Sequence, residues 1–333
     1  MTAGVIRRLP ARPDGVRTLL VVTIDTEEEG RWGGGYPREG NTCANIEWLR
    51  ELDPLIAEFG VQLTYLVDYP VASNPVAMAI LNERMARQGG EIGAHLHPWC
   101  TPPYAPEDQR TSYVGRLPVS LQRDKLTSLT ETLEEATGCR PTSYRAGRWG
   151  LSASSVPVLE ELGYLVDSSV TPLRWEQDRD GPNFMGAPVH PYLLGRKEVQ
   201  EPGEGPLLEI PATLGMARPL GRALVPVIRR LPPFPGLGRI LEGLGRVWLR
   251  PSELDETVLR QATAQWRARE WPVLNVMFHS SELMPGGSPY VRDRRDLKCF
   301  LRRLEAIFSA ALTGSGSAPA TLRQARDILL ETS

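Results

Sequence analysis

The sequence predicts an α/β fold in which parallel strands form a barrel. Short apolar runs alternate with stretches of helical periodicity along most of the chain, as expected when each strand is followed by a helix. Ionisable residues follow directly on several of these runs, and side chains at the carboxyl ends of parallel strands build the active site of such a barrel. We expect an N-terminal arm over residues 1–17 and one barrel domain over residues 18–333.

Seven apolar runs have the length and composition of buried strands. They cover residues 19–24, 61–67, 90–94, 142–144, 164–166, 207–210 and 273–278. The helices expected between and after them cover residues 45–59, 75–87, 120–138, 152–163, 253–270 and 293–312. Asn45, Ser152 and Asp293 stand where helix N-caps are expected. Residues 314–317 are expected to be a flexible connector, followed by a short closing strand and helix.

One segment differs from the rest. We expect an insertion over residues 196–250, and its part from 218 to 250 holds seven arginines against a single acid, Glu242. We call residues 218–250 the arginine-rich segment. One interpretation is that its leucines pack on the barrel while its arginines face water. Another is a basic amphipathic lid that contacts a phosphorylated or lipid-linked substrate, or makes peripheral contact with an anionic membrane. A partner or self-association surface is the third.

The bulk composition is that of an ordinary globular chain, with 41% hydrophobic and 23% charged residues. A formal net charge of −2 offers no reason to expect nucleic acid binding. No apolar run approaches the roughly 18 residues of a membrane span, and residues 1–17 lack a signal-peptide core. The cysteines show no paired spacing, so we expect reduced thiols and a cytoplasmic location. They are Cys43, Cys100, Cys139 and Cys299.

Acidic and histidine pairs follow two of the predicted strands. Asp25 and Glu27 leave an extended chain on the same side, whereas Thr26 points the other way. Two carboxylates on one face are favoured when a cation or a proton lies between them. His95 and His97 repeat this spacing and can give a divalent metal two nitrogen ligands. A carboxylate from Glu27 or Asp25 would complete a set with positions open to water, which is typical of a catalytic metal site.

Two further positions carry candidate chemistry. Arg145 follows a predicted strand, where its guanidinium can hold a carboxylate ionised and oriented. His279 ends the most apolar run and can act as a general acid near neutral pH, with Asp167 or Glu282 as its carboxylate partner.

Loop residues are candidates for substrate contact. Trp99 and Trp149 are loop aromatics of the type that stack on sugar rings, and packing alone explains them equally well. Glu282 is a further candidate for substrate contact. His190 lies in a proline-rich loop without such a context, and Asp68 ends the second predicted strand, where it can be a rim carboxylate.

These motifs together resemble the polysaccharide deacetylase (NodB-homology) family. The family pattern is an acidic motif after the first strand, a histidine motif, an arginine motif and a late histidine motif. The counterparts in this chain are residues 23–27, 91–97, 144–147 and 277–279. The resemblance covers about residues 19–312, with the insertion outside the common core. It implies a distorted (β/α) barrel with about seven parallel strands.

Two positions depart from the common family pattern. Thr26 stands where the family has a second, metal-binding aspartate, so that role would pass to Glu27. The family's H-x-x-x-H motif is H-x-H here, and Trp99 occupies the place of the second histidine. We therefore expect a variant subgroup with D-x-E and H-x-H motifs.

The resemblance implies a metal-dependent hydrolase that removes an N-acetyl group from an amino sugar or glycoconjugate and releases acetate. It implies that Glu27, His95 and His97 hold one divalent transition metal. Asp25 would be the base, oriented by Arg145, and His279 the acid. This ligand set suits Zn²⁺, and Co²⁺, Ni²⁺, Mn²⁺ or Fe²⁺ also fit.

Several alternatives stay open from the sequence alone. The substrate would be a small, lipid-linked or nucleotide-linked amino sugar, and the bond hydrolysed an N- or an O-acetyl bond. An amidohydrolase acting on a non-sugar C–N bond and a non-catalytic carbohydrate-binding protein are the other two classes. The sequence does not determine the oligomeric state.

Overall fold

The computed structural model describes residues 4–12, 14–33, 35–38, 40, 42–105, 108–175, 180–228, 234 and 236–331. Their main feature is a nine-stranded sheet with the order β10-β1-β2-β3-β4-β5-β7-β6, in which β11 also pairs with β1. The strands are β1 (Thr18–Thr26), β2 (Leu63–Val67), β3 (Glu91–Leu96), β4 (Ser143–Ala146), β5 (Val166–Asp167), β6 (Tyr192–Leu193), β7 (Leu208–Glu209), β10 (Val273–His279) and β11 (Ser317–Ala320). Only β6 pairs antiparallel, with β7. The expected α/β class is confirmed, and the seven strands from β10 to β7 are the parallel strands that the sequence predicts.

The sheet curls into a partial barrel. Arg145 on β4 contacts Thr23 and Asp25 on β1, although β2 and β3 lie between these two strands in the sheet. Asn275 on β10 likewise donates a hydrogen bond to Ser168, at 3.0 Å. A hairpin of β8 (Leu214–Met216) and β9 (Arg246–Trp248) lies against the free edge of β10. The curl brings polar side chains from distant strands into one interior.

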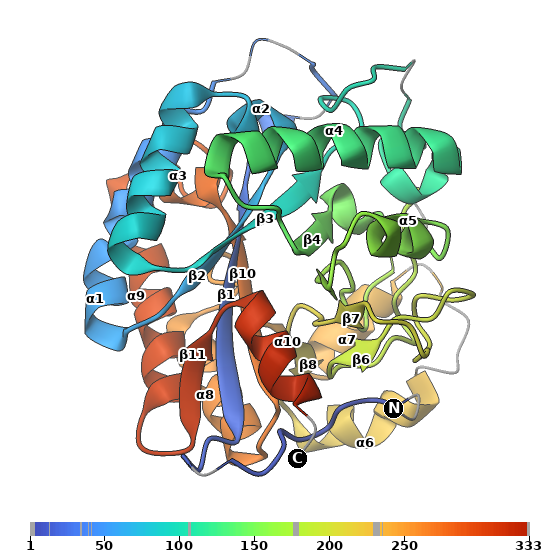
Figure 1. Cartoon of the computed structure of the whole chain (residues 1–333). Helices are drawn as coiled ribbons and strands as arrows, with labels where there is room; N and C mark the ends of the chain where they lie inside the picture. Colours follow the sequence, from blue (N-terminus) through green and yellow to red (C-terminus); the bar gives the residue numbers. More distant parts are fainter. Residues whose placement is uncertain are drawn as a thin grey trace.

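β1 is the central element of the core. All nine of its residues are buried. A parallel strand that is covered on both faces needs an almost continuous apolar sequence, which β1 has in residues 19–22. Helices cover the outside of the sheet (Figure 1). They include α1 (Asp53–Phe59), α2 (Tyr69–Ala72), α3 (Pro75–Gln88), α4 (Val119–Thr137), α5 (Ser155–Glu161), α8 (Glu256–Ala268), α9 (Arg294–Leu312) and α10 (Leu322–Leu330). In α9 the buried residues Leu297, Phe300, Leu304 and Ile307 recur at helical spacing, and each contributes roughly 1.5–3 kcal/mol by burial.

The structure corrects two helix starts. The predicted helix over residues 45–59 begins as the 3₁₀ segment η2 (Ala44–Leu52) and continues as α1. Pro54 lies in the first turn of α1, where it lacks the N–H that a continuous helix would need. Asn45 is not a cap, because its Nδ2 donates to the Glu27 carbonyl oxygen and to Ser280 Oγ, both at 2.8 Å. The predicted cap Ser152 lies two residues before Ser154, the N-cap of α5. Asp293 caps α9 as predicted.

The arginine-rich segment forms α6 (Pro219–Ile228) and α7 (Leu237–Gly243) between β8 and β9. Its buried residues Ile228, Leu237 and Leu241 form a small apolar cluster with Leu173, Met185 and Met216. Leu220 and Val227 are 64% and 56% exposed. Arg229 and Arg230 lie outside the described residues. Figure 1 places α6 near the two chain termini, at the end of the molecule away from the tip of β3.

None of the four cysteines, all of which the structure describes, forms a disulfide bond. In the part of the chain that the structure describes, no helix combines the length and the apolar character needed to cross a membrane.

Candidate active site

A pocket of about 340 Å³ lies at the carboxyl ends of β1, β3, β4 and β10. Seven predicted site residues line it: Asp25, Glu27, His95, His97, Trp99, Trp149 and His279. The other two predicted site residues are fully buried. Arg145 contacts Asp25, and Glu282 contacts His279. The curled sheet therefore brings together the residues that the sequence motifs select.

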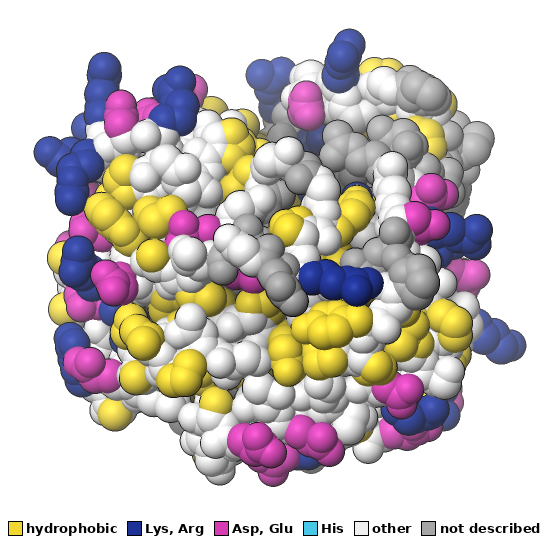
Figure 2. Space-filling view, turned by 90° about the horizontal axis from the view of Figure 1, so that it is seen from above, with side chains coloured by type: hydrophobic (Ala, Val, Ile, Leu, Met, Phe, Trp, Pro, Cys, Tyr) yellow, Lys and Arg dark blue, Asp and Glu magenta, His cyan; other side chains and the backbone are white. Residues whose placement is uncertain are grey.

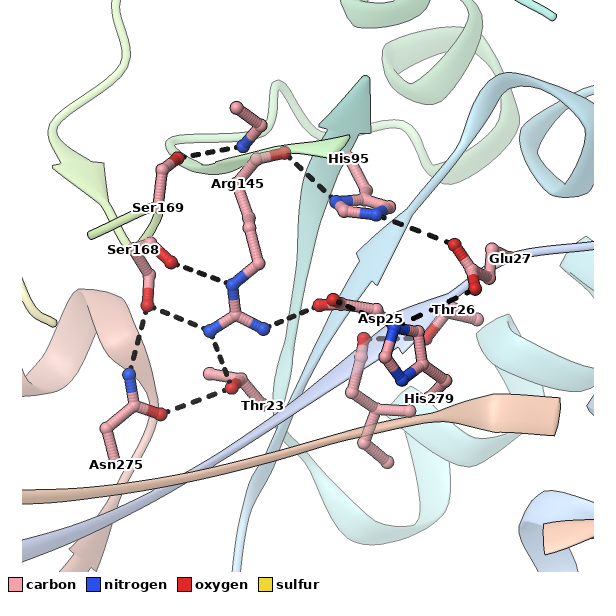
Figure 3. A network of polar contacts seen from close by, with 12 residues as sticks. Thr23, Asp25, Thr26, Glu27, His95, Arg145, Ser168, Ser169, Asn275 and His279 are labelled. Atoms are coloured by element: carbon pink, nitrogen blue, oxygen red, sulfur yellow. Dashed lines mark hydrogen bonds and ion pairs between the residues drawn. The ribbon is translucent and has the colours of Figure 1, made fainter. Parts of the chain in front are cut away.

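Asp25 and Arg145 form a buried ion pair (Figure 3). Arg145 Nη1 lies 2.5 Å from Asp25 Oδ1, and the rest of the guanidinium donates to Ser168 O at 2.8 Å and to Thr23 Oγ1 at 2.8 Å. Burial by itself raises the pKa of Asp25. The charges of Arg145, His95 and His279 outweigh burial and hold that pKa below its ordinary value. Asp25 is therefore an oriented, ionised carboxylate.

Glu27, His95 and His97 form a compact group of three possible metal ligands. Glu27 Oε2 lies 3.6 Å from Nε2 of His95 and 3.4 Å from Nε2 of His97. Ligand atoms about 2.1 Å from a tetrahedral metal are about 3.4 Å apart. The three side chains are almost completely buried. Their spacing and donor types fit one divalent transition metal, and Asp25 is not part of the group.

The hydrogen bonds of His95 determine which of its nitrogens can bind a metal. Its Nδ1 lies 3.0 Å from the carbonyl oxygen of Arg145. A carbonyl oxygen only accepts, so Nδ1 carries the proton and the lone pair of Nε2 points toward Glu27. Such a contact to the other ring nitrogen is common among metal-bound histidines.

His97 is held by packing on two sides. Its ring stacks on Trp99 with centroids 4.5 Å apart, and its Nδ1 lies 3.8 Å from Asp68 Oδ2. Gly147 lies against the ring, where a β-carbon would come within 2.0 Å of Cδ2. Trp99, four residues after His95, thus supports the ring of His97. The predicted rim position of Asp68 is wrong, because this carboxylate is fully buried behind His97.

The backbone of Glu27 is clamped just beyond the end of β1. Its carbonyl oxygen accepts from Asn45 Nδ2, and its N–H donates to Ser280 Oγ at 3.2 Å. Thr26 turns away and donates to Ile24 O at 3.0 Å, as the alternation of the strand predicts. These contacts direct the Glu27 side chain toward the two histidines.

His279 faces both carboxylates from β10. Its Nε2 lies 3.7 Å from Asp25 Oδ2 and 3.9 Å from Glu27 Oε1, and its Nδ1 lies 3.0 Å from Glu282 Oε2. Glu282 also accepts a 2.7 Å hydrogen bond from the His279 backbone N–H. Since a carboxylate accepts at Nδ1, the imidazole presents Nε2 to the pocket.

Glu282 lies behind His279 and outside the pocket lining, so its predicted contact with substrate is corrected to a contact with His279. Burial raises the pKa of Glu282, but Arg250, 3.1 Å away, and His279 lower it to about 2. The other carboxylate proposed for His279, Asp167, instead accepts hydrogen bonds from Ser169. Arg250 comes from the end of the arginine-rich segment. Trp248 of the same segment contacts the pocket residue Trp149, with ring centroids 5.7 Å apart.

The lid interpretation of the arginine-rich segment is not supported. None of its described residues lines the pocket, and α6 lies at the distant end of the molecule (Figure 1). Its buried leucines agree with the first interpretation, in which the segment packs on the barrel.

Besides the small residues Gly35 and Ala146, sequence reasoning missed three residues of the pocket wall, namely Trp32, Tyr36 and Arg148. Trp32 packs edge-on against His279, with centroids 4.9 Å apart. Trp32 lies in the short 3₁₀ segment η1 (Arg31–Gly33) and Tyr36 follows it. This glycine-rich stretch offers no periodicity to interpret. Arg148 directly follows the arginine motif, and this position in the sequence was the one sign that it could belong to the site. Seen from above, hydrophobic side chains form a broad band across the face, and most Lys and Arg side chains lie toward its edges (Figure 2).

No protein-family model matches the chain, and no curated protein sequence matches it. The chain is similar to a solved structure described as a "putative polysaccharide deacetylase" from Mycobacterium smegmatis. The two are 19% identical with a TM-score of 0.56, over 96% of this chain and 93% of that chain. This likeness confirms the fold, a distorted barrel of the kind expected from the motifs.

Two further solved structures are similar at lower TM-scores. One is a family 4 carbohydrate esterase from Streptomyces lividans in complex with acetate, with 10% identity, a TM-score of 0.42 and coverage of 91% of this chain and 98% of that chain. The other is the chitin deacetylase from the fungal pathogen Colletotrichum lindemuthianum, with 13% identity, a TM-score of 0.41 and coverage of 92% and 86%.

Proposed function

We propose that this protein is a metal-dependent hydrolase that removes an N-acetyl group from an amino sugar or glycoconjugate, producing acetate and a free amine. One observation carries the proposal. Three buried ligand atoms with the spacing of a metal site share a pocket with the Asp25–Arg145 pair and with His279. The motif resemblance and the fold support the same reaction.

The metal site and the base have separate residues. A divalent transition metal bound by Glu27, His95 and His97 would supply Lewis acidity, polarising the acetyl carbonyl and acidifying a water. Asp25 lies next to that site without belonging to it. Arg145 occupies Oδ1, which leaves Oδ2 to accept the proton of the water as its oxygen attacks the carbonyl carbon.

His279 supplies the proton that the leaving group needs. When the C–N bond breaks, the nitrogen leaves as an amine only if it gains a proton. Nε2 of His279 faces the pocket, while Glu282 holds Nδ1. Burial lowers the pKa of His279, but Glu27 and Glu282 outweigh burial and raise it above its ordinary value. The protonated imidazolium is thus favoured beside the two carboxylates.

Aromatic side chains favour a sugar as the group that carries the amide. Trp32, Tyr36 and Trp149 line the pocket and are only half-buried. Aromatic faces bind the apolar faces of sugar rings, and a pocket built for a small amide alone would need fewer of them. The sugar would be small, or linked to a lipid or a nucleotide.

Membrane contact through residues 218–250 stays a prediction. The exposed Leu220 and Val227 on α6 lie among arginines, a combination that suits an anionic lipid surface. Sedimentation with vesicles containing phosphatidylserine, with Val227→Asp as the comparison, tests it: contact requires sedimentation that the variant loses.

Acetate release from N-acetylglucosaminyl glycosides, with Zn²⁺ or Co²⁺ added, tests the proposed function. We expect release by the native protein and at least a 100-fold slower rate for Asp25→Asn, because the base is lost. Asp124→Asn is the matched control, since Asp124 is exposed on α4 away from the pocket. Acetate release only from small non-sugar amides would identify an amidohydrolase. Sugar binding without any acetate would identify a binding protein.

A further inference from the structure

Arg148 is the one lysine or arginine in the described lining of the pocket. It directly follows Gly147, which lies against the His97 ring, and directly precedes Trp149, another pocket residue. Its position is therefore next to the metal-binding group and next to an aromatic ring suited to a sugar. No step of the proposed hydrolysis uses Arg148.

The partners of Arg148 are neutral. Its Nη1 donates to Tyr36 Oη at 2.7 Å and to Ser112 Oγ, and its Nη2 donates to Tyr113 Oη at 2.7 Å. Nη1 also lies 3.4 Å from Gln109 O. The guanidinium carbon lies 4.0 Å from the centroid of the Tyr113 ring. Hydroxyls, a carbonyl oxygen and rings orient the guanidinium but leave its full charge uncompensated.

The other guanidiniums beside the pocket differ in this respect. Arg145 is paired with Asp25, and Arg250 with Glu282. Among the residues that the structure describes, no carboxylate forms an ion pair with Arg148. Since a half-buried cation in an aromatic pocket attracts an anion more strongly than one in water, the partner of Arg148 is expected to arrive with a ligand.

The backbone holds this residue in an unusual conformation. Arg148 and Trp149 both have positive φ, at 55° and 61°, a region that residues other than glycine rarely occupy. Neighbouring contacts fix this turn, including the hydrogen bond from Gly115 N to Gly150 O at 2.9 Å. Strained conformations of this kind cluster where a side chain must be presented to a ligand.

We propose that Arg148 binds a carboxylate or phosphate group of the substrate, so that the enzyme selects an acidic acetylated amino sugar. This inference rests on the proposed function. The planar fork of a guanidinium matches the two oxygens of either group, and the adjacent Trp149 would contact the ring that carries it. The acidic group would lie on the same sugar as the acetamido group, or on its direct neighbour.

Matched substrates and variants test this proposal. Acetate release is measured on N-acetylmuramic acid, N-acetylglucosamine 1-phosphate and N-acetylglucosamine 6-phosphate, each against uncharged methyl N-acetyl-β-glucosaminide. We expect kcat/KM at least tenfold higher for one acidic sugar, and a 10- to 100-fold fall of that ratio in Arg148→Gln. Arg148→Lys should keep part of the ratio. Arg110→Gln, which removes an exposed arginine outside the pocket, should keep all of it.

The outcomes separate the two proposals. A ratio that stays the same in Arg148→Gln, or a native protein that prefers the uncharged sugar, overturns the role of Arg148 and leaves the proposed function intact. If no acetate is released from any sugar, the proposed function fails, and calorimetric binding of the same sugars decides about Arg148. Binding of an acidic sugar that weakens at least tenfold in Arg148→Gln supports the role, and equal binding by both proteins, or none, overturns it.

Discussion

A β-carbon at position 147 would lie 2.0 Å from Cδ2 of His97 and 2.8 Å from its Nε2. Gly147 therefore leaves the space that the His97 ring occupies. It is the last residue of the arginine motif, and His97 belongs to the histidine motif. The two motifs thus depend on each other through packing, in addition to the hydrogen bond between His95 and the Arg145 carbonyl.

Replacing Gly147 with alanine should displace His97 and weaken metal binding. Since the added β-carbon would overlap Cδ2 of His97 and crowd its Nε2, the ring must shift, and we expect at least a tenfold loss of Zn²⁺ affinity, measured by competition with a chromogenic chelator. The control is Gly243→Ala, where an added β-carbon meets no atom within 4 Å. Equal affinity in Gly147→Ala and the native protein would show that His97 is not a ligand.

Removing the proposed ligands should remove the metal. The double variant His95→Ala/His97→Ala should retain no stoichiometric metal after dialysis, because a single carboxylate binds transition metals weakly. His190→Ala is the comparison, since His190 packs on Trp271 outside the pocket. Unchanged metal content in the double variant, measured by elemental analysis, would place the metal elsewhere.

Glu282 should stabilise the fold in a pH-dependent manner. Its pKa is about 2 in the folded protein instead of 4.5, because Arg250 and His279 outweigh the effect of burial. A depressed pKa contributes stability above pH 4.5, and that contribution is lost as pH falls from about 4.5 toward 2. We expect Glu282→Gln to lower the free energy of unfolding by roughly 3 kcal/mol at pH 7.

The difference between Glu282→Gln and the native protein should shrink in acid. Urea unfolding of both proteins at pH 7 and at pH 3.5 measures this difference in the free energy of unfolding. Groups that titrate in the same way in both proteins do not contribute to the difference. A difference of the same size at both pH values would mean that the charge of Glu282 contributes nothing.

Breaking the central ion pair should destabilise the fold as well as abolish activity. Arg145→Met leaves Asp25 buried without its counter-ion, which costs about 3–5 kcal/mol. Asp25→Asn/Arg145→Met removes both charges and should recover part of that loss. Thermal unfolding of the native protein, Arg145→Met and the double variant tests this expectation. A double variant less stable than Arg145→Met would argue against a direct pairing energy.

The sequence predicted those parts of the site that belong to regular strands. Asp25, His95 and His279 stand at the ends of predicted strands, and the register of the parallel strands brings Asp25 level with His279. Trp32 and Tyr36 could not be predicted, because loop positions have no period that relates them to the sheet. Asn45 has the sequence signature of a helix cap, yet tertiary contacts with Glu27 use its side chain instead.

Glu282 shows a second limit of sequence reasoning. Its spacing from His279 allowed contact with either the substrate or the histidine. The deciding partner, Arg250, comes from the arginine-rich segment and reaches Glu282 only after β9 has packed beside β10. Local spacing in the sequence therefore cannot decide whether Glu282 contacts the substrate or His279.

Metal content and acetate release, measured on one sample, test the central claim most directly. The protein would be purified without an affinity tag or a chelator and analysed for its elements. It would then be assayed with N-acetylglucosaminyl glycosides. We predict about one transition metal per chain together with release of acetate. A metal-free protein that gains neither metal nor activity when Zn²⁺ or Co²⁺ is added would contradict the claim.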